Sequence, residues 1–141
     1  MVYQLGSLST IGLGKHFRII MPDDIPQNKI AIFAFKGNPI CFVHVLLNAI
    51  DLHEQNNEAK IIFEGEATAL IIELRKPENP LHALYEKAKK LNLIDAVCRA
   101  CAIKMGALEA AEAEGLRITA DMAGHAGMTS YIDQGYEIIT L

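Results

Sequence analysis

The order of apolar and polar positions along the chain predicts strands that alternate with helices. Five short apolar runs are typical of strands buried on both faces of a sheet, at residues 30–35, 59–63, 93–97, 116–119 and 136–141. Segments with helical spacing lie between them, at residues 39–52, 67–74, 81–91, 98–105, 108–114 and 128–134. Because such alternation builds βαβ units, we expect an α/β fold, a three-layer α/β/α sandwich with a mainly parallel five-stranded sheet.

The first 28 residues have a different character. They are rich in glycine, proline, serine and threonine, and only Phe17–Met21 resembles a short strand. We therefore expect an N-terminal arm over residues 1–28 and a folded α/β domain over residues 29–141.

Composition narrows the class of protein. The 141 residues are 51% hydrophobic, with a mean hydropathy of +0.20, which excludes a disordered chain. The net charge of −4 and the lack of a basic block disfavour nucleic-acid binding. No apolar run approaches the roughly 20 residues that cross a bilayer, and no signal-peptide pattern is present. We therefore expect a cytoplasmic protein, with no membrane partner, whose three cysteines are thiols.

The carboxyl ends of the predicted strands carry the reactive side chains. Ligands of open parallel sheets bind at this edge, and here it holds Glu64, Cys98 and Cys101. Cys98 stands where a buried strand meets a helix, so backbone N–H groups and the helix dipole favour its thiolate. The alternative is an inert buried thiol, because cysteine is among the most buried residue types.

Cys101 follows three residues later, and the pair admits several interpretations. A Cys-x-x-Cys pair suits a dithiol redox site, a supporting thiol or simple helix packing. Together with Cys41 and His44 it also has the composition of a zinc site. His44, however, stands in a largely apolar helix, where a half-buried histidine is common.

Two further positions have both a chemical and a plain structural interpretation. Glu64 and Glu66 flank Gly65, so the pair suits either acid–base chemistry or a capped turn. His125, in the segment Ala-Gly-His-Ala-Gly, suits either a proton shuttle or an ordinary loop residue, and we favour the loop.

Three segments carry a resemblance to a known family. They are Ile61–Ala67 (IIFEGEA), Ala96–Ala102 (AVCRACA) and Gly135–Thr140 (GYEIIT). From Lys29 to Leu141 the chain resembles the DsrE/DsrF-like family, which includes the TusD-type sulfur-relay proteins. The resemblance implies an α/β sandwich that forms homotrimers or homohexamers, with a cysteine that receives sulfur as a persulfide. Cys98 is the nearest match to that cysteine, and Cys101 has no counterpart in the TusD-type pattern.

The sequence therefore leads to a sulfur-relay hypothesis. Cys98 would accept sulfane sulfur from a donor protein and pass it to an acceptor protein, Glu64 would tune the charge, and Cys101 would assist; no cofactor is expected. Family membership alone does not establish an activity, so two alternatives stay open. One is a non-catalytic, oligomeric module that binds a small ligand in the same crevice, and the other is a metal-binding regulator.

Overall fold

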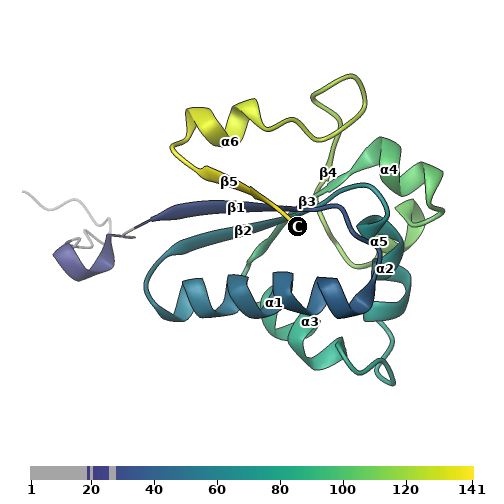
Figure 1. Cartoon of the computed structure of the whole chain (residues 1–141), viewed down its shortest axis with the longest axis horizontal. Helices are drawn as coiled ribbons and strands as arrows, with labels where there is room; N and C mark the ends of the chain where they lie inside the picture. Colours follow the sequence, from purple (N-terminus) through teal and green to yellow (C-terminus); the bar gives the residue numbers. More distant parts are fainter. Residues whose placement is uncertain (1–18, 20, 26–27) are drawn as a thin grey trace, which may run out of the picture.

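The structure is a computed structural model that describes residues 19, 21–25 and 28–141. Within these residues the chain forms a central sheet with helices on both sides (Figure 1). The strands are β1 (Lys29–Ala34), β2 (Glu58–Phe63), β3 (Ile94–Cys98), β4 (Ile118–Thr119) and β5 (Glu137–Thr140). The helices are η1 (Pro22–Asp24), α1 (Pro39–Glu54), α2 (Ala67–Leu74), α3 (His82–Lys90), α4 (Arg99–Lys104), α5 (Leu108–Ala113) and α6 (Thr129–Asp133).

The five strands form one parallel sheet in the order β4-β3-β2-β1-β5. Strand β1 lies between β2 and the edge strand β5, so that Ile32 is placed between Ile61 and Ile139. Continuous apolar runs suit such strands because both faces of the sheet are covered. The predicted fold class is therefore confirmed.

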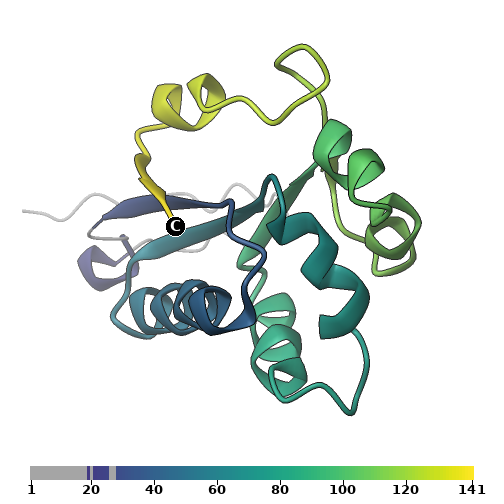
Figure 2. The ribbon, with the colours of Figure 1, turned by 45° about the vertical axis from the view of Figure 1, so that its right-hand side comes forward.

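Side chains of β1 point alternately into two cores. Ile30 and Ile32 join the larger core, which is packed against α1, α2, α3 and α5. Phe33 points the other way, into a smaller core with Tyr131 of α6 and Tyr136. Figures 1 and 2 show the resulting layers, with α6 on one side of the sheet and α1 to α3 on the other. This arrangement is the expected three-layer sandwich.

Local signals explain where elements begin. The Asn38 side chain accepts a hydrogen bond of 2.8 Å from the N–H of Ile40, and Pro39 opens α1, as the sequence predicts. Most other ends lie within two residues of the expected positions. The strand expected at Phe17–Met21 lies largely outside the described residues, as does most of the expected N-terminal arm.

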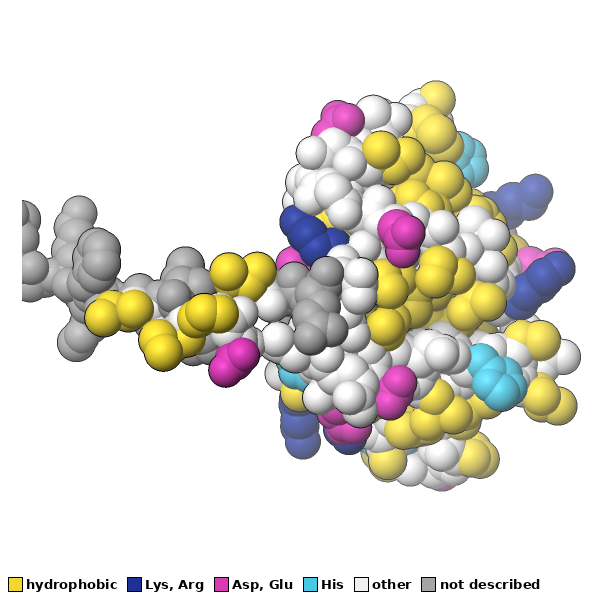
Figure 3. Space-filling view, turned by 60° about the vertical axis from the view of Figure 1, so that its left-hand side comes forward, with side chains coloured by type: hydrophobic (Ala, Val, Ile, Leu, Met, Phe, Trp, Pro, Cys, Tyr) yellow, Lys and Arg dark blue, Asp and Glu magenta, His cyan; other side chains and the backbone are white. Residues whose placement is uncertain are grey.

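The edge strand β5 and the helix α1 both carry exposed apolar side chains. Ile139 of β5 and Leu47 and Ile40 of α1 are exposed, and Figure 3 shows hydrophobic side chains gathered in patches on one face. Leu141 continues the pairing with β1, because its N–H donates to Phe33 and its carbonyl accepts from Phe35. Across the described residues, no helix is both long enough and apolar enough to span a membrane.

Candidate functional site

Four reactive side chains meet at the carboxyl edge of the sheet. Glu64, Cys98, Cys101 and His125 each offer an oxygen, sulfur or nitrogen atom, and these atoms all lie within 4.8 Å of one another. The first three are the site residues that the sequence predicts, and the structure brings them together. The fourth, His125, was expected to be an ordinary loop residue.

A tight turn after β2 places Glu64. Its N–H donates to the carbonyl of Ala34, so the residue continues alongside β1. Gly65 then adopts a φ of +48°, where a Cβ would lie 3.2 Å from the carbonyl oxygen of Phe35. A left-handed turn with so close a neighbour requires glycine. The turn leaves the Glu64 side chain only 5% exposed.

The two cysteines lie at the junction of β3 and α4. Cys98 is the last residue of β3 and the N-cap of α4, and its side chain makes no capping hydrogen bond. It is fully buried in the smaller core. Cys101 lies in the first turn of α4 and is partly exposed. Molecules from solvent can therefore reach the Cys101 side chain, whereas the Cys98 side chain is covered by the rest of the protein.

A two-residue turn brings His125 to the cysteines. Met122 and His125 exchange two backbone hydrogen bonds of 2.9 Å, and Ala123 and Gly124 between them have φ values of 50° and 90°. Two positive φ values are typical of a type I′ turn. The carbonyl of Gly124 accepts a 3.0 Å hydrogen bond from the N–H of Ala100, which fastens the turn to α4.

The four side chains are in hydrogen-bond contact. Nδ1 of His125 lies 3.3 Å from Sγ of Cys98 and 3.5 Å from Sγ of Cys101. The Cys101 thiol also donates to Oε2 of Glu64 at 3.4 Å. Burial, followed by hydrogen bonds with Cys98 and Glu64, raises the pKa of the Cys101 thiol to about 12. The protonated thiol is therefore the favoured form of Cys101, and a reaction at this sulfur requires a group that accepts the proton.

Two cavities open next to the cluster. The larger has a volume of about 540 Å³ and a mainly apolar wall. The smaller, of about 300 Å³, shares Gly65, Cys101 and His125 with it. Cys101 can thus be reached from both cavities. The other residues of the larger cavity are Phe35, Glu64, Met122, Ala126, Met128 and Thr129.

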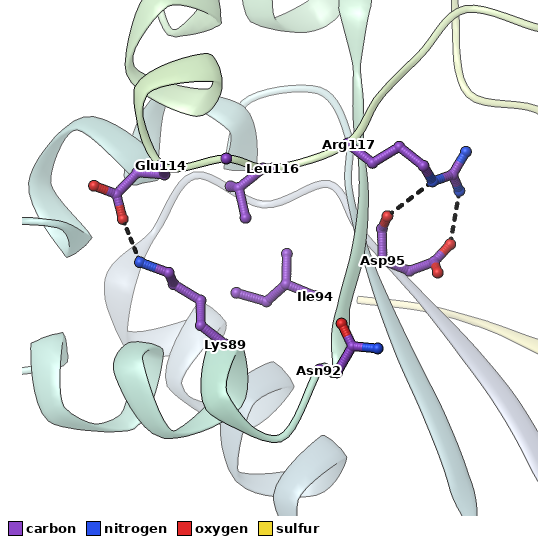
Figure 4. A pocket seen from close by; sticks show the side chains of 8 residues that line it. Lys89, Asn92, Ile94, Asp95, Glu114, Leu116 and Arg117 are labelled. Carbon is purple, nitrogen blue, oxygen red and sulfur yellow. Dashed lines mark hydrogen bonds and ion pairs between the residues drawn. The ribbon is translucent and has the colours of Figure 1, made fainter.

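Another pocket lies at the open side of β3, and its charges are paired. It has a volume of about 340 Å³. Figure 4 shows Lys89 against Glu114 on one side of this pocket and Arg117 against Asp95 on the other. These ion pairs hold α3, α5 and the sheet together, so they have a structural role.

The zinc set suggested by the sequence, Cys41 and His44 with Cys98 and Cys101, does not form. Cys41 and His44 are both exposed on α1, and neither belongs to the cluster. Their places next to the two cysteines are taken by Glu64 and His125. The sequence signal for His125 was the two-glycine segment around it, since Gly124 permits the turn that brings the ring back to α4.

Comparison with known proteins gives relatives without a described activity. No family model matches the chain. It is 37% identical over 99 residues to the uncharacterized protein MJ0733 of Methanocaldococcus jannaschii, covering 70% of this chain and 78% of that protein. An uncharacterized protein of Archaeoglobus fulgidus is 37% identical over 59 residues, covering 42% of this chain and 93% of the relative.

A solved structure supports the fold. The conserved protein of unknown function BT1422 from Bacteroides thetaiotaomicron superposes with a TM-score of 0.62 and 14% identity, covering 81% of this chain and 95% of that one. At this identity the likeness shows the fold alone. The identity to MJ0733 over most of its length goes further, and the chain belongs to the same protein family as MJ0733.

Proposed function

We propose that this protein carries sulfane sulfur as a cysteine persulfide and passes it to a partner thiol, in the manner of the DsrE/DsrF-like proteins it resembles. The observation that carries the proposal is the Cys101 thiol, which lines the cavity and donates to the Glu64 carboxylate at 3.4 Å. A nucleophile with a base in hydrogen-bond contact is the arrangement that thiol chemistry requires. His125 lies 3.5 Å from the same sulfur.

The proposal places the sulfur on Cys101 rather than on Cys98. Cys98 was the first choice from the sequence, but its side chain is fully buried, and a donor molecule must touch the sulfur that it loads. Thiol exchange depends on access as well as on thiolate fraction. Cys98 is then a buried neighbour of the persulfide on Cys101.

The loading step conserves atoms and electrons. Glu64 accepts the proton of Cys101 while the sulfur of Cys101 attacks the outer sulfur of a donor persulfide, so that no free thiolate has to accumulate. A bond forms between Cys101 and that outer sulfur while the sulfur–sulfur bond of the donor breaks. The donor leaves as a thiol that has taken up the proton, so no external oxidant or reductant is consumed. Transfer to an acceptor thiol repeats the step in the opposite direction.

Mass spectrometry of the intact protein tests this proposal. After incubation with a small-molecule persulfide, the wild type should gain the mass of one sulfur atom, and peptide mapping should place it on Cys101. Cys101→Ser should lose the adduct, whereas Cys41→Ser, which removes an exposed cysteine outside the cluster, should keep it. A wild type that gains no sulfur, or an adduct that survives in Cys101→Ser, would refute sulfur carriage at this residue.

Oligomer formation and a cytoplasmic setting complete the proposal. Exposed apolar residues on α1 and on the edge strand β5 support assembly into a homotrimer or homohexamer, because apolar patches commonly mark interfaces. The free thiols at the site suit a reducing compartment.

The apolar cavity also favours a second candidate, a non-catalytic module that binds a small ligand. Its volume of about 540 Å³ is in the range of small-molecule pockets. This candidate requires an unreactive Cys101 together with a ligand that raises the melting temperature. The persulfide experiment therefore separates the two candidates.

A further inference from the structure

We infer that Glu64, Cys98, Cys101 and His125 form a binding site for Zn²⁺ or a similar divalent transition-metal ion. The inference goes beyond sulfur carriage and stands on the arrangement of these four side chains alone. Three observations support it: the spacing of the donor atoms, the lack of a Lys or Arg partner for Glu64 in the described part of the chain, and the access to the cluster.

The spacing of the donor atoms suits a tetrahedral ion. With Zn–S bonds of about 2.3 Å and Zn–N and Zn–O bonds of about 2.0–2.2 Å, neighbouring ligand atoms of a tetrahedral site lie about 3.4–3.8 Å apart. The two sulfur–nitrogen distances are 3.3 and 3.5 Å, and the sulfur–oxygen distance from Cys101 to Glu64 is 3.4 Å. All remaining pairs lie within 4.8 Å, so closure around an ion requires shifts of about 1 Å.

Within the described part of the chain, the Glu64 carboxylate forms no ion pair with a lysine or arginine. It is 5% exposed. Its hydrogen-bond partner at the cluster is a neutral thiol. A buried carboxylate without a counter-charge costs free energy. An ion bound between Glu64 and the sulfurs supplies that charge.

The ligand types select the class of metal. Two thiols and an imidazole suit Zn²⁺ and other transition metals, whereas Mg²⁺ and Ca²⁺ prefer oxygen ligands. The ion displaces the thiol protons into solvent as the thiolates coordinate. Nδ1 of His125 is the ring nitrogen directed at both sulfurs.

The cluster is accessible and adjustable. Both cavities reach Cys101 and His125, so an ion can enter from solvent. His125 is exposed and stands on a short turn held by local hydrogen bonds, which allows small shifts without loss of the sheet. With four protein ligands the ion would have no open position, as in structural rather than catalytic zinc sites.

Metal binding and sulfur loading exclude each other, because the ion uses both sulfurs. This consequence rests on the proposed function, whereas the metal site does not. Zn²⁺ added first should protect Cys101 from the persulfide, and a chelator should restore its reaction. If the protein binds Zn²⁺ but never accepts sulfur, the metal site stands and the proposed function fails.

Titration with the metal alone tests the site. The reduced, metal-free protein should bind one Zn²⁺ per chain by calorimetry, with a rise in melting temperature. Co²⁺ in place of Zn²⁺ should give the strong visible absorption of a tetrahedral ion and a thiolate-to-metal charge-transfer band. Cys98→Ser should weaken binding by more than the roughly 10- to 100-fold that loss of an outer-shell partner causes.

Matched variants distinguish metal binding at the four-residue cluster from metal binding by a histidine on the surface. His125→Gln should weaken binding as strongly as Cys98→Ser, whereas His44→Gln, which changes an exposed histidine of α1, should bind like the wild type. Cys98→Ser should keep the circular dichroism spectrum and the cooperative unfolding of the wild type, which shows that the variant is folded. A wild type that takes up no Zn²⁺, or an unchanged affinity in both Cys98→Ser and His125→Gln, would overturn the inference.

Discussion

Two carboxylates on neighbouring strands of the same sheet have opposite surroundings. Asp95, on β3, lies 3.2 Å from Lys60, accepts a 2.8 Å bond from Arg117 and accepts a 2.5 Å bond from Tyr131. Glu64, directly after β2, is more buried, and a thiol is its partner at the cluster. The charge of Asp95 is therefore balanced by neighbouring cations, whereas no lysine or arginine of the described residues pairs with Glu64.

Asp95 therefore belongs to a structural network, whereas the surroundings of Glu64 are those of a binding site. Asp95 is tied to Lys60 of β2, to Arg117 directly before β4 and to Tyr131 of α6, so no external molecule is needed to balance its charge. Glu64 is kept next to two sulfurs and an imidazole at the edge where parallel sheets bind ligands. Three experiments test whether the two carboxylates differ in this way.

Removing the balanced carboxylate should have the largest effect on stability. Asp95→Ala takes away the acceptor of hydrogen bonds from Arg117 and Tyr131, and bonds to charged groups contribute about 1.5–3 kcal/mol. We expect the free energy of unfolding to fall by about 2–3 kcal/mol in urea titrations. Glu112→Ala, on the exposed side of α5, is the control and should change it by less than about 0.5 kcal/mol. Equal losses in the two variants would contradict a special role for Asp95.

Lowering the pH should remove part of the stability that Asp95 contributes to the fold. Burial alone raises the pKa of Asp95, but the hydrogen bonds from Tyr131 and Arg117 and the charge of Lys60 outweigh it and hold the pKa below the usual value of an aspartate. A lowered pKa adds stability above the unfolded value, and this stability is lost as the pH falls through the folded value.

The difference in unfolding free energy between the wild type and Asp95→Ala should therefore narrow below about pH 4. Urea titrations of both proteins at about pH 6 and about pH 3 measure it. Other acidic groups are common to both proteins and cancel in this difference. A gap that is constant across this range would show that the Asp95 charge does not stabilise the fold.

Neutralising the unbalanced carboxylate should have the smallest effect, with the opposite sign. In the metal-free protein, Glu64→Gln keeps the shape of the side chain and removes a buried carboxylate that pairs with no described lysine or arginine. We expect the free energy of unfolding to stay constant or rise by less than about 1 kcal/mol. Glu66→Gln, at the exposed neighbour, is the control. A loss of more than about 2 kcal/mol would mean that Glu64 has a structural partner after all.

The features that the sequence predicts correctly depend on residues that lie close together in the chain. Continuous apolar runs such as residues 30–35 identify strands buried on both faces, and Asn38-Pro39 marks the start of α1. Because all the strands are parallel, their carboxyl ends share an edge, and this geometry alone brings Glu64 close to Cys98 and Cys101.

The parts that it misses depend on exact backbone paths. His125 reaches the cysteines through a turn in which Ala123 has a φ of 50°, a conformation that alanine rarely adopts. Cys98 and Cys101 have the same chemistry, and only the direction of α4 makes one buried and the other accessible. The sequence does contain a signal at Asp95, because a charged residue inside an apolar strand requires partners. It does not identify these partners, because they come from distant segments of the chain.

The pairing of Leu141 with β1 has a practical consequence for experiments. Its carbonyl accepts a bond from Phe35, a residue that lines the larger cavity. An affinity tag fused after Leu141 would emerge beside the cavity mouth, and a polyhistidine tag there would compete for added zinc. Purification handles therefore belong at the amino end, while a fluorophore joined after Leu141 would sit close enough to report on whatever enters.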